Sequence, residues 1–100
     1  MAILVVFYGK GITKDMYEAL RKEIKWESQP APGGVLHAAG FDGSGDIHVA
    51  DIWESEQDMN NFVSGQLAPA MQKLNIPMPE VKVYPAHNIN VFSKADKYKV

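Results

Sequence analysis

Two spacings of apolar residues divide the chain into predicted strands and helices. Residues 2–8 form a continuous apolar run rich in β-branched and aromatic types, which predicts a strand buried on both faces. From Met16 to Ile24 apolar side chains recur every four residues, so a helix is predicted over residues 13–25. The proline- and glycine-rich residues 30–34 then end this helix in a loop.

A hairpin and a capped helix are predicted next. Strands are expected over residues 35–41 and 47–53, with a turn at residues 42–45 whose two glycines can take a positive φ. Ser55 directly follows the third strand and is a good N-cap, because its hydroxyl can accept from backbone N–H groups left free in the first helical turn. Gly65 is expected to interrupt the helix that begins there.

The last third of the chain is expected to return to the sheet. A second helical segment is predicted over residues 69–74, with Pro69 near its first turn, where the missing N–H costs little. A fourth strand is predicted over residues 81–92, interrupted near Pro85. Residues 93–100 are expected to form a short polar tail.

The element order, β-α-β-β-α-β, predicts an α+β ferredoxin-like fold with an antiparallel four-stranded sheet. Both crossovers must be right-handed, which places both helices on one face of the sheet. Strands 2–8 and 47–53 nevertheless carry apolar residues on both faces, and a bare apolar face would be a large exposed patch. We therefore expect residues 1–92 to form a single domain that dimerises with a second copy through its helix-free face.

Composition narrows the class of protein. The chain has 100 residues, a net charge of −2 and no long run of like charge, so neither nucleic acid nor a membrane is expected as a partner. It has no cysteine, so neither a disulfide framework nor thiolate chemistry is expected. The apolar N-terminal run is too short to span a bilayer and lacks the basic start of a signal peptide, which favours a cytoplasmic protein.

The third strand ends in Trp-Glu-Ser-Glu-Gln, residues 53–57. With that ending on this topology, the chain resembles the dimeric α/β-barrel superfamily over roughly residues 2–92. Its antibiotic biosynthesis monooxygenase-like and stress-responsive branches are the most similar, above all small bacterial members with no assigned activity. The resemblance implies two sheets packed face to face in a homodimeric α/β barrel. It also implies a small-molecule pocket in each subunit, between the sheet and its own helices.

The same resemblance implies which residues line the pocket. In the family's cofactor-independent oxygenases the Trp of the Trp-Glu-Ser segment lines it, so Trp53 would do so here. Val49 and Asp51 would point the same way, because alternate residues of a strand share a face. Met59 and Phe62 would form the helical wall.

Several residues that carry chemistry in relatives are missing. Haem-degrading relatives use an Asn in the first strand, a Trp in the following helix and a later His, and none of these is present. Oxygenase relatives place an Asn and a Tyr where Val49 and Met59 stand, and cyclase relatives use a Tyr and a His that residues 59–74 lack. Haem degradation is therefore not expected. No cofactor is predicted, because no phosphate-cradling glycine loop follows a strand.

Asp51 and His37 are the candidates for catalysis. Asp51 lies on a strand that otherwise reads apolar, and a buried carboxylate must be paired, hydrogen-bonded or protonated. A hairpin loop with an odd number of residues would place His37 on the same face as Asp51, whereas an even one would not. If they meet, Asp51 orients the imidazole and His37 acts as general base, or the pair only ties two strands together.

The other histidines have a less direct link to the pocket. His87 and Asn88 follow Pro85 and could present polar groups at a pocket rim, as substrate-binding residues, or at the dimer seam. His48 is expected on the partner-facing or exposed side. No spacing of His and Asp matches a metal-ligand motif, so no metal is predicted.

Three functions remain open at this stage. The first is cofactor-independent chemistry, of the oxygenase, isomerase or cyclase type, on a small aromatic or enolisable molecule. The second is ligand binding without catalysis, and the third is a structural dimer module whose pocket is packed shut. A pocket of about 300 Å³ or more with convergent polar groups favours the first two.

Overall fold

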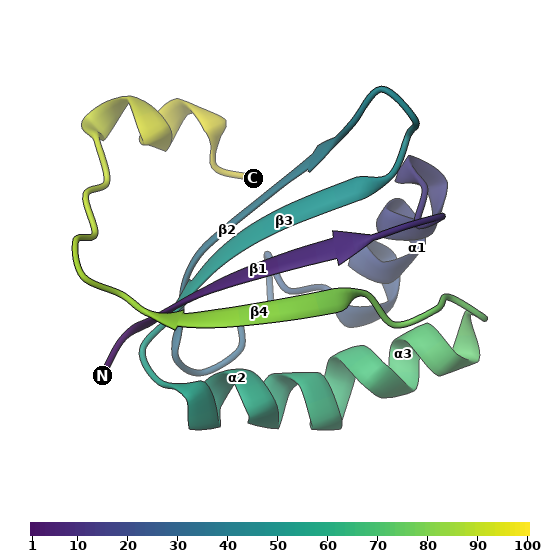
Figure 1. Cartoon of the computed structure of the whole chain (residues 1–100), viewed down its shortest axis with the longest axis horizontal. Helices are drawn as coiled ribbons and strands as arrows, with labels where there is room; N and C mark the ends of the chain where they lie inside the picture. Colours follow the sequence, from purple (N-terminus) through teal and green to yellow (C-terminus); the bar gives the residue numbers. More distant parts are fainter.

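The computed structural model describes residues 1–100 and confirms the predicted ferredoxin-like architecture (Figure 1). Four antiparallel strands form one sheet in the order β2-β3-β1-β4. The strands are β1 (Ile3–Gly9), β2 (Gly34–Phe41), β3 (Ile47–Trp53) and β4 (Glu80–Pro85). The helices are α1 (Lys14–Ile24), α2 (Glu56–Phe62), η1 (Val63–Leu67), α3 (Ala68–Lys73) and η2 (Ser93–Tyr98).

Side-chain caps start α1 and α2 where the sequence predicts. The Thr13 hydroxyl accepts from the Met16 N–H at 3.3 Å, and the Ser55 hydroxyl accepts from the Asp58 N–H at 3.1 Å. Both capping residues have extended backbone, as an N-cap requires. The Ser55 cap fixes the direction in which the chain leaves β3, so it positions the helical wall over the sheet.

The predicted interruption at Gly65 is wrong. The chain passes from α2 through η1 into α3 without leaving the helical conformation, and η1 is a single π-helical turn. In that turn the Ala68 N–H bonds to the Val63 carbonyl, five residues back. A π turn accommodates one extra residue, so Gly65 is carried within a continuous helical wall instead of breaking it.

The fourth strand ends at Pro85, so the prediction that it reaches Phe92 is wrong. Its last pairing with β1 joins Ile3 and Pro85, after which the Ala86 N–H bonds to the Ala2 carbonyl at 3.0 Å. β1 begins at Ile3, so the paired part of the two strands ends there. The tail predicted at residues 93–100 contains a short 3₁₀ helix, η2.

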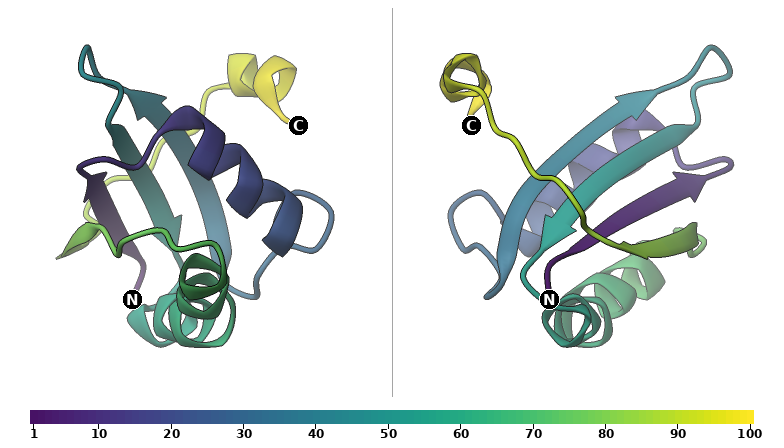
Figure 2. Two further views of the ribbon diagram at one scale, coloured as in Figure 1. Left: turned by 90° about the vertical axis from the view of Figure 1, so that its right-hand side faces the viewer. Right: turned by 60° about the vertical axis from the view of Figure 1, so that its left-hand side comes forward.

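The helices α1, α2 and α3 all lie on one face of the sheet, as right-handed crossovers require (Figure 2). The hydrophobic core fills the space between these helices and the sheet. Its strand residues alternate along β1 and β3, which is the period expected when one face is covered. They are Ile3, Val5, Phe7, Ile47, Val49 and Trp53, and they pack with Leu20, Ile24, Met59, Ala70 and Met71 from the helices.

The opposite face of the sheet has no helix, and the segment after β4 runs on that side (Figure 2). Alternate apolar residues of the strands are therefore open to solvent in the single chain: Val6 is 36% exposed, Leu36 38% and Tyr84 48%. In the single chain β1 is thus fully buried on the helix-covered face only, and burial of its other face, predicted for residues 2–8, depends on a partner subunit. None of the helices combines the length and the apolar character needed to cross a membrane.

Candidate functional site

The loop of residues 42–46 determines which side chains meet across the hairpin. It contains an odd number of residues, and it places His37 directly opposite Asp51 in the β2–β3 register. The Asp42 carboxylate holds the loop by accepting from two backbone N–H groups within it, at 2.9 and 3.1 Å. The loop length that the sequence left open is therefore odd in register, and His37 and Asp51 share the helix-covered face of the sheet.

These two residues form the centre of a hydrogen-bonded chain. His37 Nδ1 lies 2.7 Å from Asp51 Oδ1, and the Trp53 indole N–H donates to Asp51 Oδ2 at 3.3 Å. On the other side of the ring, His37 Nε2 lies 2.7 Å from the Tyr17 hydroxyl. A carboxylate can only accept, so Nδ1 of the neutral imidazole carries the proton and Nε2 accepts from Tyr17.

Asp51 is the one charged residue buried in the core, with 7% of its surface exposed. Both of its carboxylate oxygens have partners, and no buried side-chain nitrogen or oxygen of the protein lacks one. Hydrogen bonds from His37 and Trp53 compensate for the loss of water around the carboxylate. The charge is therefore fixed in position beside the imidazole ring.

Tyr17 and Trp26 complete the aromatic wall around His37, and neither was predicted from the sequence. The Tyr17 ring stacks parallel to the imidazole at a centroid distance of 6.0 Å, and the Trp26 ring meets it edge-on at 5.4 Å. Tyr17 precedes Leu20 by three residues and Ile24 by seven, so helical periodicity contained a signal for it. Trp26 lies in the loop after α1, where no periodicity exists to reveal it.

Burial raises the pKa of Tyr17 to about 12. Arg21 opposes this shift, while the carboxylates of Glu27, Glu18 and Asp51 raise the pKa further. Tyr17 therefore stays protonated at neutral pH and acts as a hydrogen-bond donor to His37.

An open pocket of about 260 Å³ lies between the sheet and its helices, next to this chain of hydrogen bonds. The volume is slightly below the 300 Å³ expected for a ligand site, so only a small molecule fits. Fourteen of the 19 lining residues are hydrophobic, and none is Lys or Arg. The sheet supplies Phe7, Ile47, Val49, Asp51 and Trp53, and the helical wall supplies Phe62, Leu67 and Met71.

One short stretch of chain, residues 26–36, forms a large part of the pocket rim; its lining members are Trp26, Pro30, Ala31, Gly34, Val35 and Leu36. Gly33 anchors this stretch against the start of α2. Its φ is +87°, and an added Cβ would collide with the Asp58 side chain, so only glycine fits. The Gly33 carbonyl also accepts from the Glu54 N–H at 2.8 Å.

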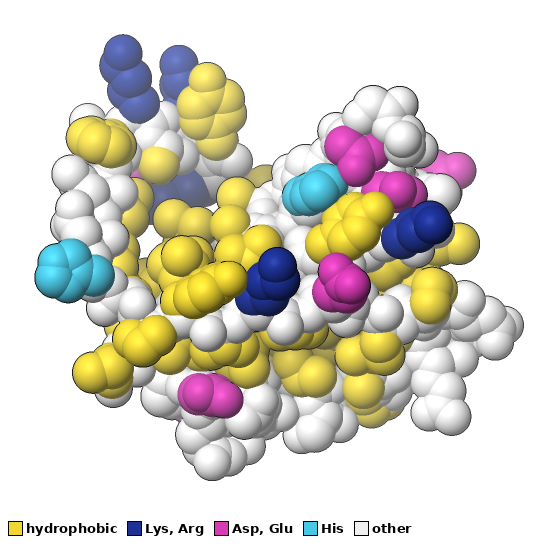
Figure 3. Space-filling view, viewed as in Figure 1, with side chains coloured by type: hydrophobic (Ala, Val, Ile, Leu, Met, Phe, Trp, Pro, Cys, Tyr) yellow, Lys and Arg dark blue, Asp and Glu magenta, His cyan; other side chains and the backbone are white.

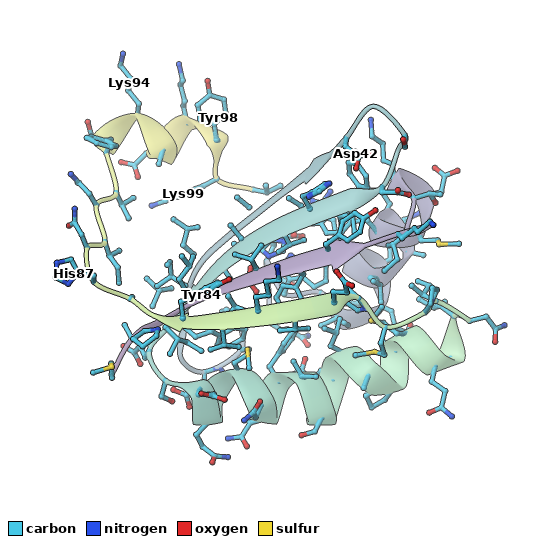
Figure 4. All side chains as sticks on the ribbon, viewed as in Figure 1. Asp42, Tyr84, His87, Lys94, Tyr98 and Lys99 are labelled. Carbon is cyan, nitrogen blue, oxygen red and sulfur yellow. The ribbon has the colours of Figure 1, made fainter.

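The predicted site residues fall into two groups. His37, Asp51, Val49, Trp53 and Phe62 line the pocket. Met59 is buried in the core but does not line it, and His87 and Asn88 are exposed beyond the end of β4, with His87 pointing away from the sheet (Figure 4). No group of three or more His, Asp and Glu side chains is placed to hold a metal ion.

No family model matches the chain, and no curated protein matches its sequence. Solved structures do match. A conserved protein from Methanosarcina mazei Go1 has a TM-score of 0.63 at 15% identity, covering 84% of this chain and 91% of that one. The chain has the same fold.

Two further matches carry names that describe an activity. A proposed antibiotic biosynthesis monooxygenase from Deinococcus radiodurans has a TM-score of 0.60 at 18% identity, covering 93% of this chain and 100% of that one. SnoaB, a cofactor-independent oxygenase from Streptomyces nogalater, has a TM-score of 0.59 at 13% identity, covering 88% and 93%. The resemblance to monooxygenase-like proteins is thus confirmed for the fold alone.

Proposed function

We propose that the protein binds one small aromatic or enolisable molecule in the pocket beside His37, and that the His37–Asp51 pair accepts a proton from it without a cofactor. One observation carries the proposal: an imidazole oriented by a buried carboxylate lies in the wall of an open, mostly apolar pocket. An apolar site with a few fixed polar groups is the usual form of a small-molecule site.

The electrostatics of the pair suit proton transfer. When the imidazole gains a proton, the Asp51 carboxylate 2.7 Å away stabilises the positive charge. Loss of a proton from a bound phenol or enol leaves an electron-rich anion. Such an anion is a reasonable first intermediate for isomerisation, cyclisation or reaction with oxygen, and the name of SnoaB supports cofactor-free chemistry on this fold.

Ligand binding without catalysis is the second candidate, and one observation favours it. Tyr17 already occupies His37 Nε2, so the ring has no free nitrogen in the structure. A site whose imidazole has both nitrogens hydrogen-bonded can simply hold a ligand in place. The two candidates differ in whether the bound ligand loses its proton.

The test uses 4-nitrophenol, whose absorption spectrum distinguishes the phenol from the phenolate. Quenching of tryptophan fluorescence measures binding, because Trp26 and Trp53 both line the pocket. We expect binding to the wild type and to a control variant in η2, Ala95→Phe, but not to Ala31→Phe, which fills the pocket rim. The bound probe should be largely phenolate in the wild type and phenol in His37→Gln.

Each result decides between the candidates. Binding without ionisation in the wild type would favour the non-catalytic ligand site. Equal binding by Ala31→Phe would mean that the probe lies elsewhere, and both candidates would fail for this pocket.

We also propose that the functional unit is a homodimer joined through the helix-free face. That face exposes Val6, Leu36 and Tyr84, and the segment after β4 adds Val91 at 54% and Phe92 at 70% exposure. Hydrophobic side chains gather in the hollow between this segment and the sheet (Figure 3). A second copy related by a two-fold axis would cover the same patch on both chains.

Light scattering coupled to size exclusion tests the dimer. We expect twice the chain mass of 11.1 kDa for the wild type at micromolar concentration. Val6→Asp should give the monomer mass, because it places a charge in the middle of the apolar face. Met78→Asp, an equal change at an exposed loop residue, is the control and should remain dimeric. A monomeric wild type would exclude the proposed assembly.

A further inference from the structure

Outside the His37–Asp51 pair, Tyr17 is the one side chain of the pocket wall with an oxygen that can accept a hydrogen bond from a ligand. His37, Asp51 and Trp53 use their polar atoms on one another and on the Tyr17 hydroxyl. The Tyr17 oxygen donates its proton to His37 Nε2 and accepts no hydrogen bond from the protein, so its lone pairs remain available. Tyr17 also lines the pocket.

We infer that Tyr17, rather than His37, is the group that meets the ligand, and that the ligand is a neutral phenol or enol whose O–H proton passes through the Tyr17 hydroxyl to His37 Nε2. The inference rests on the proposed function and narrows it. It names the residue in contact with the ligand, and it restricts the ligand to molecules that carry their acidic proton on oxygen.

The proton transfer balances without any further reactant. The ligand O–H bond breaks and its proton bonds to the Tyr17 oxygen, while the Tyr17 proton moves to His37 Nε2. No group is oxidised or reduced. The ligand becomes an anion and the imidazole a cation, so the total charge of site and ligand is unchanged, and the new cation lies beside the Asp51 carboxylate.

The surroundings of Tyr17 suit this role. Burial raises the pKa of Tyr17 to about 12, which disfavours the tyrosinate form. In the relay Tyr17 gains one proton as it loses another, so it never needs to carry a negative charge. The short 2.7 Å contact to Nε2 already holds the hydroxyl in line with its acceptor.

The pocket lining indicates why the ligand is neutral and aromatic or planar. The lining contains one carboxylate, Asp51, and no Lys or Arg that could pair with an anionic ligand. The aromatic rings of Tyr17 and Trp26 lie 5.6 Å apart in the wall, which favours stacking and edge contacts with a planar ring. A neutral phenol meets both conditions and supplies the O–H donor that the Tyr17 oxygen requires.

The decisive variant is Tyr17→Phe, which keeps the ring and removes only the hydroxyl. With 4-nitrophenol as the probe, we expect the phenolate-to-phenol ratio of the bound molecule to fall by about tenfold or more relative to wild type. Tyr8→Phe is the matched control, because Tyr8 lies on the helix-free face of the sheet, away from the pocket, and its hydroxyl bonds to Asp46. Its bound probe should ionise as in the wild type.

A second measurement uses the unmodified protein. 4-Nitroanisole has the same ring system but carries a methyl group in place of the phenolic proton. We expect it to bind about tenfold more weakly than 4-nitrophenol, because it cannot donate to the Tyr17 oxygen.

The outcomes separate this inference from the proposed function. If Tyr17→Phe ionises the probe as well as wild type does, or if 4-nitroanisole binds as tightly as 4-nitrophenol, the relay through Tyr17 is wrong while the pocket and His37 stand. If the wild type binds the probe without ionising it, the proton-accepting function itself fails.

Discussion

Two histidine–aspartate pairs lie on opposite faces of the same sheet, and their lengths are almost equal. His37 Nδ1 lies 2.7 Å from Asp51 Oδ1 on the helix-covered face, and His48 Nε2 lies 2.8 Å from Asp42 Oδ2 on the helix-free side. Their burial differs: the aspartate side chain is 10% exposed in the first pair and 36% in the second. The distance between the partners therefore does not distinguish a candidate site from a surface contact.

What distinguishes the pairs is the set of groups attached to them. The inner pair continues to Tyr17 at one end and to Trp53 at the other, and it borders the pocket. The outer pair ends in the hairpin loop, where the Asp42 carboxylate also accepts from two backbone N–H groups (Figure 4). The inner pair is the one we propose to accept a proton from a ligand, whereas the outer pair holds a turn.

Neutralising the two aspartates should give the largest contrast. Asp51→Asn removes a buried charge on which the His37 and Trp53 hydrogen bonds depend, so we expect the free energy of unfolding to fall by about 1–3 kcal/mol. Asp42→Asn should change it very little at pH 7, because water screens that pair. Urea denaturation of both variants measures the difference. Equal losses would mean that burial does not separate the pairs.

A smaller contrast should appear at alkaline pH. The pKa of Tyr17 is raised by burial to about 12 in the folded protein from 10.0, so the folded state holds this proton more tightly. The resulting stabilisation is complete below about pH 10 and is lost as the pH rises toward 12. Tyr17→Phe should therefore flatten the decline in denaturation midpoint over this range. Parallel curves for the two proteins would contradict the burial of the hydroxyl.

The outer pair should be visible at acid pH, with a still smaller effect. The hydrogen bond from His48 is the main cause that lowers the pKa of Asp42, and backbone N–H groups of the loop add to it. The stabilisation is present above the ordinary titration range of an aspartate and is lost as the pH falls through the lowered pKa. Asp42→Asn should make the acid limb of the stability curve shallower. A steeper limb in this variant would contradict the assignment.

The final contrast involves no change in stability. The hydrogen bonds require the neutral His37 ring to carry its proton on Nδ1 and the neutral His48 ring to carry its proton on Nε2. Nitrogen-15 NMR at a pH well above the histidine titration range, about pH 9, distinguishes the two tautomers. Finding the same tautomer at both residues would show that one of the pairs does not form.

The sequence could predict the fold because local signals agreed with one another. Ser55 capped α2, and the predicted strand at residues 47–53 matches β3. The meeting of His37 with Asp51 could not be predicted, because it depends on whether the hairpin loop has an odd or even number of residues. Asp42 carried a usable signal, since an aspartate at the start of a loop often bonds to backbone N–H groups two and four residues on.

Other parts of the site depend on packing that no local pattern records. Trp26 reaches the pocket because the chain reverses direction after α1, and Lys25 adopts a left-handed φ of 62° at that point. Gly65 reads as a helix breaker, yet packing of the helical wall on the sheet keeps it helical. β4 ends at Pro85, where its pairing with the first residue of β1 ends. The local sequence of β4 does not show where the neighbouring strand begins.

The rim formed by residues 26–36 has a consequence for how this protein could change. Gly33 packs that stretch against the start of α2, while the groups proposed to accept a proton, His37, Asp51 and Tyr17, belong to the sheet and to α1. Much of the pocket rim is thus one continuous peptide, which ends just before His37 and contains none of the groups proposed to accept the proton. Exchanging the residues between Trp26 and Gly33 should redirect the protein to a new molecule without rebuilding its chemistry. This stretch is therefore where sequence changes, natural or engineered, should alter ligand choice most readily.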